Sequence, residues 1–131
     1  QNLPELTSLN VGSIQGITDA GVKHLRGNTG LTYLGLFDND NVSNQGLRAL
    51  GNMKSMKRLK LWHLPKIDGA GLSFLPAMGG LEHLDLSTCF GIGDAGLEHL
   101  KSASHGTGKS CLKTLYLDNL PKITDVGVSH L

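Results

Sequence analysis

The chain has 131 residues, with 12 Lys and Arg against 11 Asp and Glu, so its formal net charge at pH 7 is +1. This length suffices for one domain with its own hydrophobic core. The near-neutral balance excludes the strong basic field that recruits nucleic acid or anionic membranes, and no apolar run approaches the ~20 residues of a membrane span. Two cysteines, Cys89 and Cys111, make no disulfide framework, which favours an intracellular, cytoplasmic protein.

The dominant pattern is a unit that is written five times, and such repeats must be identified before secondary structure is assigned. Each unit opens with the shape L-x-x-L-x-L, and the intervals between the openings are 25, 25, 25 and 31 residues. The openings are at Leu6, Leu31, Met56, Leu81 and Leu112. A glycine follows 15 positions after each opening, and a leucine follows four positions after that glycine. The glycines are Gly21, Gly46, Gly71, Gly96 and Gly127.

Each unit changes its hydrophobic period halfway, from the period of a strand to that of a helix. The first half predicts strands near residues 8–12, 33–37, 58–62, 83–87 and 114–118. The second half predicts a short helix, as in the segment ITDAGVKHL. Here Thr18 is the expected N-cap, and the negative charge of Asp19 in the first turn interacts favourably with the positive end of the helix dipole. The same cap position holds Ser43, Asp68, Gly93 and Thr124 in the later units. No unit can bury its aliphatic face alone, so the units must stack.

These motifs resemble the leucine-rich repeat over essentially the whole chain. The resemblance implies an α/β fold, a right-handed solenoid with a parallel concave sheet and helices on the convex side. It implies one domain, residues 1–131, with repeats at about 6–30, 31–55, 56–80, 81–111 and 112–131, as part of a longer chain. Among the subtypes the pattern is most similar to the cysteine-containing repeats of F-box substrate receptors, where only Cys89 stands at the class cysteine position. We expect Cys89 to be a small buried hydrophobic residue.

Both ends of this stack are expected to be unfinished. Leu131 stands at a repeat position that is expected to be buried, at the end of a predicted helix. The segment NLPEL is typical of the last part of a preceding helix and its loop. Stacks of repeats need polar caps that shield the core at their ends. We therefore expect that the functional chain is longer or that a partner covers the ends.

The stretch ASHGTGKS, residues 103–110, fits a loose phosphate-binding P-loop pattern. Such a loop needs a strand before it and a helix after it, because the helix N-terminus binds the phosphates. Here the order is the opposite, since the stretch follows the expected helix DAGLEHL and precedes the expected strand CLKTLYL. We therefore expect no nucleotide at Lys109, no other cofactor, and a surface loop in this place.

The sequence offers little catalytic or metal-binding chemistry. His24, His99 and His130 share one helical position, but two imidazoles without a third ligand make a poor zinc site, and we expect them to face solvent. No Ser/His/Asp or Cys/His set has matching neighbours in the repeat geometry, so we expect no enzyme and no bound metal. The acidic residues that recur at the helix starts are expected to be structural, and they are Asp19, Asp94 and Asp125.

The outward positions of the predicted strands carry four of the six Phe, Trp and Tyr residues of the chain. Exposed Trp, Tyr and Arg are frequent hot spots of protein interfaces. The candidate partner-binding residues are Tyr33, Phe37, Arg58, Lys60, Trp62, His83, Asp85, Tyr116 and Asp118. The alternative is mutual shielding, with Tyr33 and Arg58 as a cation–π pair and Phe37 and Trp62 as an aromatic ladder.

The charge along this face changes from basic to acidic from one unit to the next, and this change indicates which class of partner the face can bind. The third unit offers Arg58 and Lys60, whereas the fourth and fifth offer Asp85 and Asp118. A mixed-charge protein surface suits this pattern better than nucleic acid, which needs a longer row of Lys and Arg. We therefore expect a non-catalytic protein-interaction module that uses its concave sheet and binds no membrane. The alternatives are an architectural subunit within a larger assembly and the substrate-receptor part of an F-box-type ubiquitin ligase.

Overall fold

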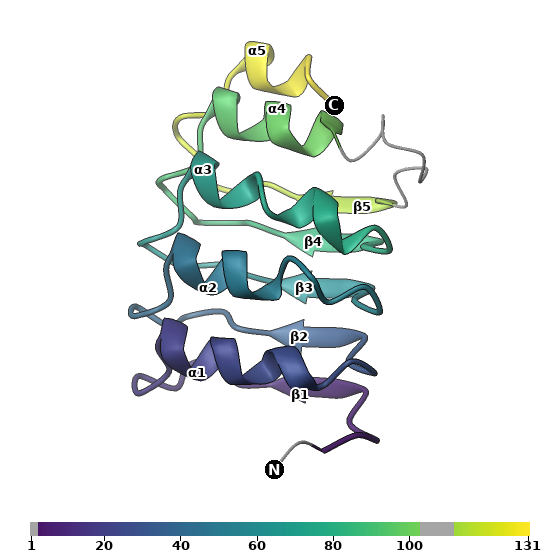
Figure 1. The fold of residues 1–131 in the computed structure, drawn as a ribbon. Helices are drawn as coiled ribbons and strands as arrows, with labels where there is room; N and C mark the ends of the chain where they lie inside the picture. The colour runs from purple at the N-terminus through teal and green to yellow at the C-terminus, as the bar shows by residue number, and fades with distance from the viewer. Residues whose placement is uncertain (1–2, 103–111) are drawn as a thin grey trace.

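The computed structural model describes residues 3–102 and 112–131, which form a stack of five strand–helix units (Figure 1). The P-loop-like stretch with Lys109, and Cys111, lie outside these residues. The strands are β1 Ser8–Asn10, β2 Tyr33–Gly35, β3 Arg58–Lys60, β4 His83–Asp85 and β5 Thr114–Tyr116. The helices are α1 Asp19–His24, α2 Asn44–Leu50, α3 Gly69–Leu72, α4 Asp94–Ser102 and α5 Asp125–Val128, with 3-10 turns η1 Leu25–Gly27 and η2 Leu75–Met78. None of the helices in the described ranges has the length and apolarity to cross a membrane.

The strands form one parallel sheet in chain order, and the helices lie along one face of it (Figure 1). The register pairs residues at equal repeat positions, so that Leu9 lies beside Leu34 and Leu34 beside Leu59. This arrangement confirms the predicted α/β leucine-rich-repeat solenoid. The sequence placed the strand starts correctly.

The predicted strands were too long, because each observed strand ends two residues earlier than expected. The next residue still bonds to the neighbouring unit, as when the Val11 N–H donates to the Gly35 carbonyl at 2.9 Å. Two residues later the backbone takes a left-handed conformation in every unit, with φ between 54° and 59°. These residues are Ser13, Asp38, His63, Thr88 and Asn119. The left-handed residue turns the chain away from the strand direction and ends the ladder.

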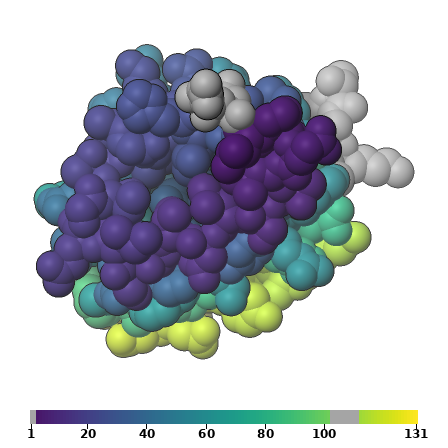
Figure 2. All heavy atoms as spheres, turned by 90° about the horizontal axis from the view of Figure 1, so that it is seen from below, coloured from purple at the N-terminus to yellow at the C-terminus, as the bar shows by residue number. Residues whose placement is uncertain are grey.

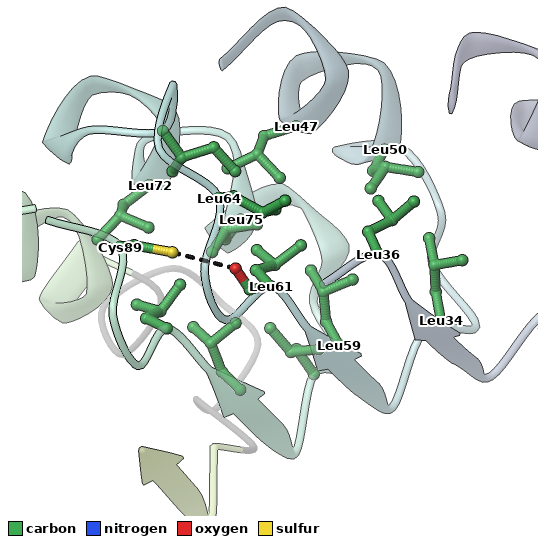
Figure 3. Packing of buried hydrophobic residues seen from close by; sticks show 14 of the residues in the cluster. Leu34, Leu36, Leu47, Leu50, Leu59, Leu61, Leu64, Leu72, Leu75 and Cys89 are labelled. Atoms are coloured by element: carbon green, nitrogen blue, oxygen red, sulfur yellow. Dashed lines mark hydrogen bonds between the residues drawn. The ribbon is translucent and has the colours of Figure 1, made fainter. Parts of the chain in front are cut away.

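The hydrophobic core fills the space between the sheet and the helices (Figure 3). Leu34, Leu59 and their equivalents in the central units are fully buried, as the repeat pattern predicts. Cys89 is also fully buried, and its thiol donates a hydrogen bond to the Leu61 carbonyl at 3.0 Å. Burial raises the pKa of the Cys89 thiol to about 11. The prediction of Cys89 as a small buried hydrophobic residue is confirmed.

The core is closed in the middle of the stack and open at both ends. Leu31 and Met56, which open the second and third units, are fully buried, whereas Leu6 and Leu112 are only partly buried. Six of the seven exposed large apolar residues of the described chain lie in the first unit, the segment before it, or the last unit. They are Leu3, Ile14, Tyr116, Val126, Val128 and Leu131.

One acidic side chain ties each of two helix starts to the unit before it. Asp19 accepts hydrogen bonds from the Ser43 N–H at 2.8 Å, the Ser43 hydroxyl at 2.6 Å and the Gly46 N–H at 2.9 Å. Asp94 likewise accepts from the N–H and the hydroxyl of Thr124, at 2.7 and 2.6 Å. These bonds from Thr124 lower the pKa of the Asp94 carboxyl. The predicted structural role of Asp19 and Asp94 is confirmed.

Between the second and third units an asparagine makes the same connection. The Asn44 side chain accepts from the Asp68 N–H at 3.2 Å and donates to the Asp68 carboxylate at 2.7 Å. The expected caps Ser43, Asp68 and Thr124 also accept a hydrogen bond from the backbone of their own helix. Thr18 stands at the cap position of α1, but its side chain makes no such bond.

The repeated glycine leaves room for this capping side chain. A Cβ atom on Gly46 would lie 2.7 Å from the Asp19 carboxylate oxygen that caps the helix. The glycines of the third and fifth units are equally crowded, with less than 3.0 Å between such a Cβ and the capping oxygen of the unit before. In the third unit Gly69 takes the place of the capping residue, and a Cβ on Gly96 would instead lie 2.7 Å from the Gly69 Cα. The spacing of the glycines therefore follows from the contact between units.

Replacement of Gly46 by alanine should destabilise the protein by about 1–3 kcal/mol, because the new Cβ displaces an Asp19 carboxylate that accepts three hydrogen bonds. Urea unfolding measures the effect, with Gln45→Ala on the same helix as the control. In an Asp19→Ala background the same change should be neutral or stabilising, since alanine favours a helix over glycine. A Gly46→Ala protein at least as stable as the parent would contradict this account.

Stability should also fall as the pH rises from about 9 to about 11, because the Cys89 pKa is higher in the folded than in the unfolded chain. Below this window the thiol is neutral in both states, and within it the unfolded chain alone loses the proton. Urea unfolding at several pH values in a Cys111→Ser background isolates this thiol. Cys89→Ala should flatten the pH dependence in that window, and an unchanged slope would refute the assignment.

Candidate functional site

The sheet face opposite the helices carries three rows of side chains, which we call the exposed sheet face. Its register is fixed by the strand pairing. The first row is Ser8, Tyr33, Arg58, His83 and Thr114, and the second is Asn10, Gly35, Lys60, Asp85 and Tyr116. The third row follows the strand ends and is Gly12, Phe37, Trp62, Ser87 and Asp118. All nine predicted binding residues lie in these rows.

A groove of about 380 Å³ lies at the centre of the exposed sheet face. Six of the nine predicted residues line it, together with parts of Leu59 and Leu84. They are Tyr33, Arg58, Lys60, His83, Asp85 and Tyr116. Phe37, Trp62 and Asp118 do not line the groove. Trp62, which we expected to be the central binding residue, lies in the third row outside the lining of the groove, and its role in binding stays a prediction.

Phe37 and Trp62 stack on each other, with ring centroids 4.9 Å apart and planes inclined by 8°. Trp62 also approaches His63, at a centroid distance of 6.2 Å. On its other side the Phe37 ring lies over Gly12, where a Cβ would overlap the ring atoms. Both aromatic residues are half-buried as a result. The aromatic ladder of Phe37 and Trp62, which the sequence offered as the alternative to binding, is formed.

The cation–π pair of Tyr33 and Arg58, which belonged to the same alternative, is not formed. The aromatic contacts within the described ranges are those of Phe37, Trp62 and His63. Tyr33 instead folds along its own strand, with its hydroxyl 3.2 Å from the point where a Cβ on Gly35 would lie. The exposed Arg58 guanidinium is therefore open to a ligand in the groove.

A chain of polar side chains borders the third row, and the sequence reasoning missed it. The Ser13 hydroxyl donates to Asp38 at 2.9 Å, and His63 Nδ1 lies 2.7 Å from the other Asp38 carboxylate oxygen. Hydrogen bonds from His63 and Ser13 lower the pKa of the Asp38 carboxyl. Ser13, Asp38 and His63 stand 25 residues apart in the sequence, and this equal spacing was the available signal. The hydrogen bond to Asp38 holds the His63 ring beside Trp62.

The acidic side of the face is partly engaged in local hydrogen bonds. Asp85 accepts from the Ser87 N–H at 3.1 Å, and Asp118 accepts from the Ser87 hydroxyl at 3.2 Å. Asp118 is nevertheless exposed and Asp85 is half-buried, so both carboxylates retain accessible surface. The face therefore keeps its graded charge, basic on β3 and acidic toward β5.

The helix side carries a second groove, of about 490 Å³, between α1 and α2. Lys23, Arg26 and Arg48 line it, and this basic cluster was not expected from the sequence. Lys23 and Arg48 occupy the same repeat position, which could have indicated it.

The row of histidines on the helices faces solvent only in part. His24 and His99 are exposed as predicted, but His130 is half-buried. Asp94 of the preceding unit lies near enough to interact electrostatically with His130. No group of three or more His, Cys, Asp or Glu side chains in the described ranges could hold a metal ion.

Solved structures share this fold, whereas no family model and no curated protein matches the sequence. Actin-binding site 2 of leiomodin-1 superposes with a TM-score of 0.67 at 21% identity, over 87% of this chain and 71% of that one. The tropomodulin C-terminal domain of Caenorhabditis elegans gives 0.70 at 11% identity, over 97% of this chain and 80% of that one. A chain of the yeast Rad7–Elc1 complex gives 0.65 at 20% identity, over 88% of this chain and 33% of that one.

At these identities the similarity establishes the fold. It supports the leucine-rich-repeat class that the sequence motifs indicate. It does not support the more specific resemblance to the repeats of F-box substrate receptors.

The stack of Phe37 on Trp62 can be tested through fluorescence, because Trp62 is the only tryptophan of the chain. Phe37→Ala should shift the emission of Trp62 to longer wavelength and increase its quenching by acrylamide, since one face of the indole becomes accessible to water. Phe90→Ala, at an exposed aromatic residue in another row, is the matched control. Unchanged emission and quenching in Phe37→Ala would refute the stacked geometry.

Proposed function

We propose that the chain is a non-catalytic protein-interaction module that binds a protein partner through the exposed sheet face. The observation that carries this proposal is the central groove, in which two tyrosines, Tyr33 and Tyr116, flank the basic pair Arg58 and Lys60 and the acid Asp85. Tyrosine and arginine are the residue types that dominate protein interfaces. A parallel sheet holds their backbone in place, so that binding needs to order only the side chains.

The charges in and beside the groove specify the chemistry of the partner. Arg58 and Lys60 suit a carboxylate, while Asp85, one strand further along the sheet, and Asp118, two strands further, suit a cation. A partner segment with acidic and basic residues in sequence meets both requirements. The phosphate backbone of a nucleic acid would need basic residues along the whole sheet. On this face it would meet the carboxylates of Asp85 and Asp118 instead.

The structural neighbours are compatible with this proposal. The leiomodin-1 structure comprises an actin-binding site, and the Rad7 structure is a complex with Elc1. Both descriptions concern protein partners, which supports the class of interaction for this chain. An intracellular location agrees with such partners and with the buried thiol of Cys89.

A second candidate function is that of an architectural subunit within a larger assembly. A neighbouring subunit, or further repeats of a longer chain, could cover the six exposed apolar residues near the two ends of the described stack. A role as substrate receptor of an F-box-type ligase rests on the position of Cys89 alone. An F-box segment in the full-length chain would favour the receptor, and co-purification with a fixed complex would favour the architectural role.

Capture of partners on the immobilised chain, followed by mass spectrometry and calorimetry with each captured protein, tests the exposed sheet face. Tyr116 is 51% exposed, so Tyr116→Ala should preserve the fold. It should weaken binding by roughly thirtyfold, equivalent to about 2 kcal/mol, which is typical for loss of an aromatic anchor. Trp62→Ala should also weaken binding, but its stability must be measured in parallel because the stack on Phe37 is lost.

The matched controls are Lys23→Ala and Glu98→Ala on the exposed side of the helices. Both should leave the affinity unchanged. If these two changes weaken binding while Tyr116→Ala and Trp62→Ala do not, the helix side is the binding surface and the proposal is wrong. Steep loss of binding with salt would indicate nucleic acid rather than protein.

A further inference from the structure

The groove between α1 and α2 on the helix side of the stack plays no part in the proposed function. It has a volume of about 490 Å³, and the two helices that flank it lie side by side (Figure 1). Figure 2 looks along the stack from the first unit, whose atoms, in purple, lie in front of those of the later units. Both walls of the groove belong to the first two units, so the groove does not depend on what precedes α1.

Three basic side chains from both walls line this groove. Lys23 is in the last turn of α1, Arg26 is in the 3-10 turn η1 that follows, and Arg48 is in the last turn of α2. All three are exposed, and none of them forms an ion pair or a hydrogen bond through its side chain with another residue of the described ranges. Three cations therefore share one groove without a partner.

The carboxylate that lines the groove is already engaged. Both oxygens of Asp19 accept hydrogen bonds, from the Ser43 N–H, the Ser43 hydroxyl and the Gly46 N–H. Residues 17–30 and 42–55, which carry the helices of the first two units, contain four Lys and Arg and no acid besides Asp19. Their formal charge is +3, whereas that of the whole chain is +1. Positive charge is therefore concentrated on this part of the helix side.

The helix dipole does not account for this cluster. A basic residue in the last turn of a helix interacts favourably with the dipole, but α3 and α5 have none in that turn. Arg26 lies beyond the end of α1. The helices of this stack therefore form without a basic residue at their ends.

Small side chains leave room between the two helices. Ala20 and Ala49 line the groove, whereas the repeat position of Ala49 holds Phe74 in the third unit and His99 in the fourth. Liquid water occupies about 30 Å³ per molecule, so the groove is far larger than a single small anion such as phosphate requires. It suits a segment of chain that carries several negative charges.

We propose that this groove binds an acidic segment of a protein partner, whose Asp or Glu carboxylates pair with Lys23, Arg26 and Arg48. A guanidinium group binds a carboxylate through two parallel hydrogen bonds. The side-chain amides of Gln45 and Asn52, which also line the groove, supply further donors. The site is separate from the exposed sheet face and does not depend on the partner of that face.

The repeat position of Lys23 and Arg48 favours an acidic protein segment over nucleic acid. In the next two units the same position holds Ser73 and Glu98. The basic surface is therefore two units wide, whereas the phosphate backbone of a nucleic acid needs a longer row. Packed helices lie about 8–10 Å apart, and roughly three extended residues cover that distance. A short run of acidic residues therefore matches the groove.

Binding of a fluorescently labelled hexaglutamate peptide, followed by fluorescence anisotropy at low ionic strength, tests the groove, with hexaglutamine as the uncharged control. The double variant Arg26→Gln, Arg48→Gln should bind hexaglutamate roughly tenfold more weakly, because each substitution removes one ion pair. The matched control is Lys66→Gln, Lys122→Gln, which removes the same charge from exposed positions outside the groove. It should keep the affinity within about twofold of the parent. Both double variants should unfold at the temperature of the parent, because all four side chains are exposed.

Amide chemical shifts in NMR spectra locate the bound peptide. They should change at Ala20, Gln45, Ala49 and Asn52, which line the groove, and not along β3. Changes centred on Arg58 of β3 would place the acidic peptide on the exposed sheet face and overturn this proposal. An equal loss of affinity in both double variants, no binding of hexaglutamate, or tighter binding of a hexathymidylate oligonucleotide would overturn it as well.

Discussion

The stack depends on one contact that recurs between units, in which a side-chain oxygen at the start of one helix caps the start of the next. Asp19, Asn44 and Asp94 make this contact, and each satisfies backbone N–H groups that a helix start leaves unpaired. The aliphatic core supplies most of the stabilisation, but apolar contacts alone do not fix the register between units. Strand pairing fixes it, and at three of the four junctions the capping oxygen adds to this, because it fits only opposite a residue that lacks a Cβ.

The fixed register of the units determines the exposed sheet face. Since each strand pairs with its neighbour at equal repeat positions, residues 25 positions apart lie side by side. Substitutions at equal repeat positions therefore change one row of the exposed sheet face and leave the residues of the core as they are. The Phe37–Trp62 stack and the Asp38–His63 pair both arise from such rows. Side chains on this face can therefore change while the buried leucines of the core stay the same.

Much of this architecture could be predicted from the sequence, because the core leucines recur at fixed spacing and their burial follows from it. The strand ends could not, since the left-handed turns are made by Ser13, Asp38 and His63 rather than by glycine, which is the usual signal. The candidate residues of the face were all placed correctly on it. The repeat spacing did not indicate which of them line the groove, because it does not encode side-chain direction, as for Tyr33, whose hydroxyl lies toward Gly35.

The contact between the third and fourth units shows how the two sides of the sheet are coupled. Here Gly69 replaces the capping side chain, and the α3 and α4 backbones approach so closely that a Cβ on Gly96 would lie 2.7 Å from the Gly69 Cα. The strands of these two units, β3 and β4, carry Arg58, Lys60 and Asp85 at the centre of the groove. A Cβ on either glycine would press on the backbone of the other helix. The pairing of Lys60 with Asp85 across β3 and β4 sets the spacing of basic and acidic groups in the groove, and the glycine contact lets the helices on the opposite side of the sheet follow at the same close spacing.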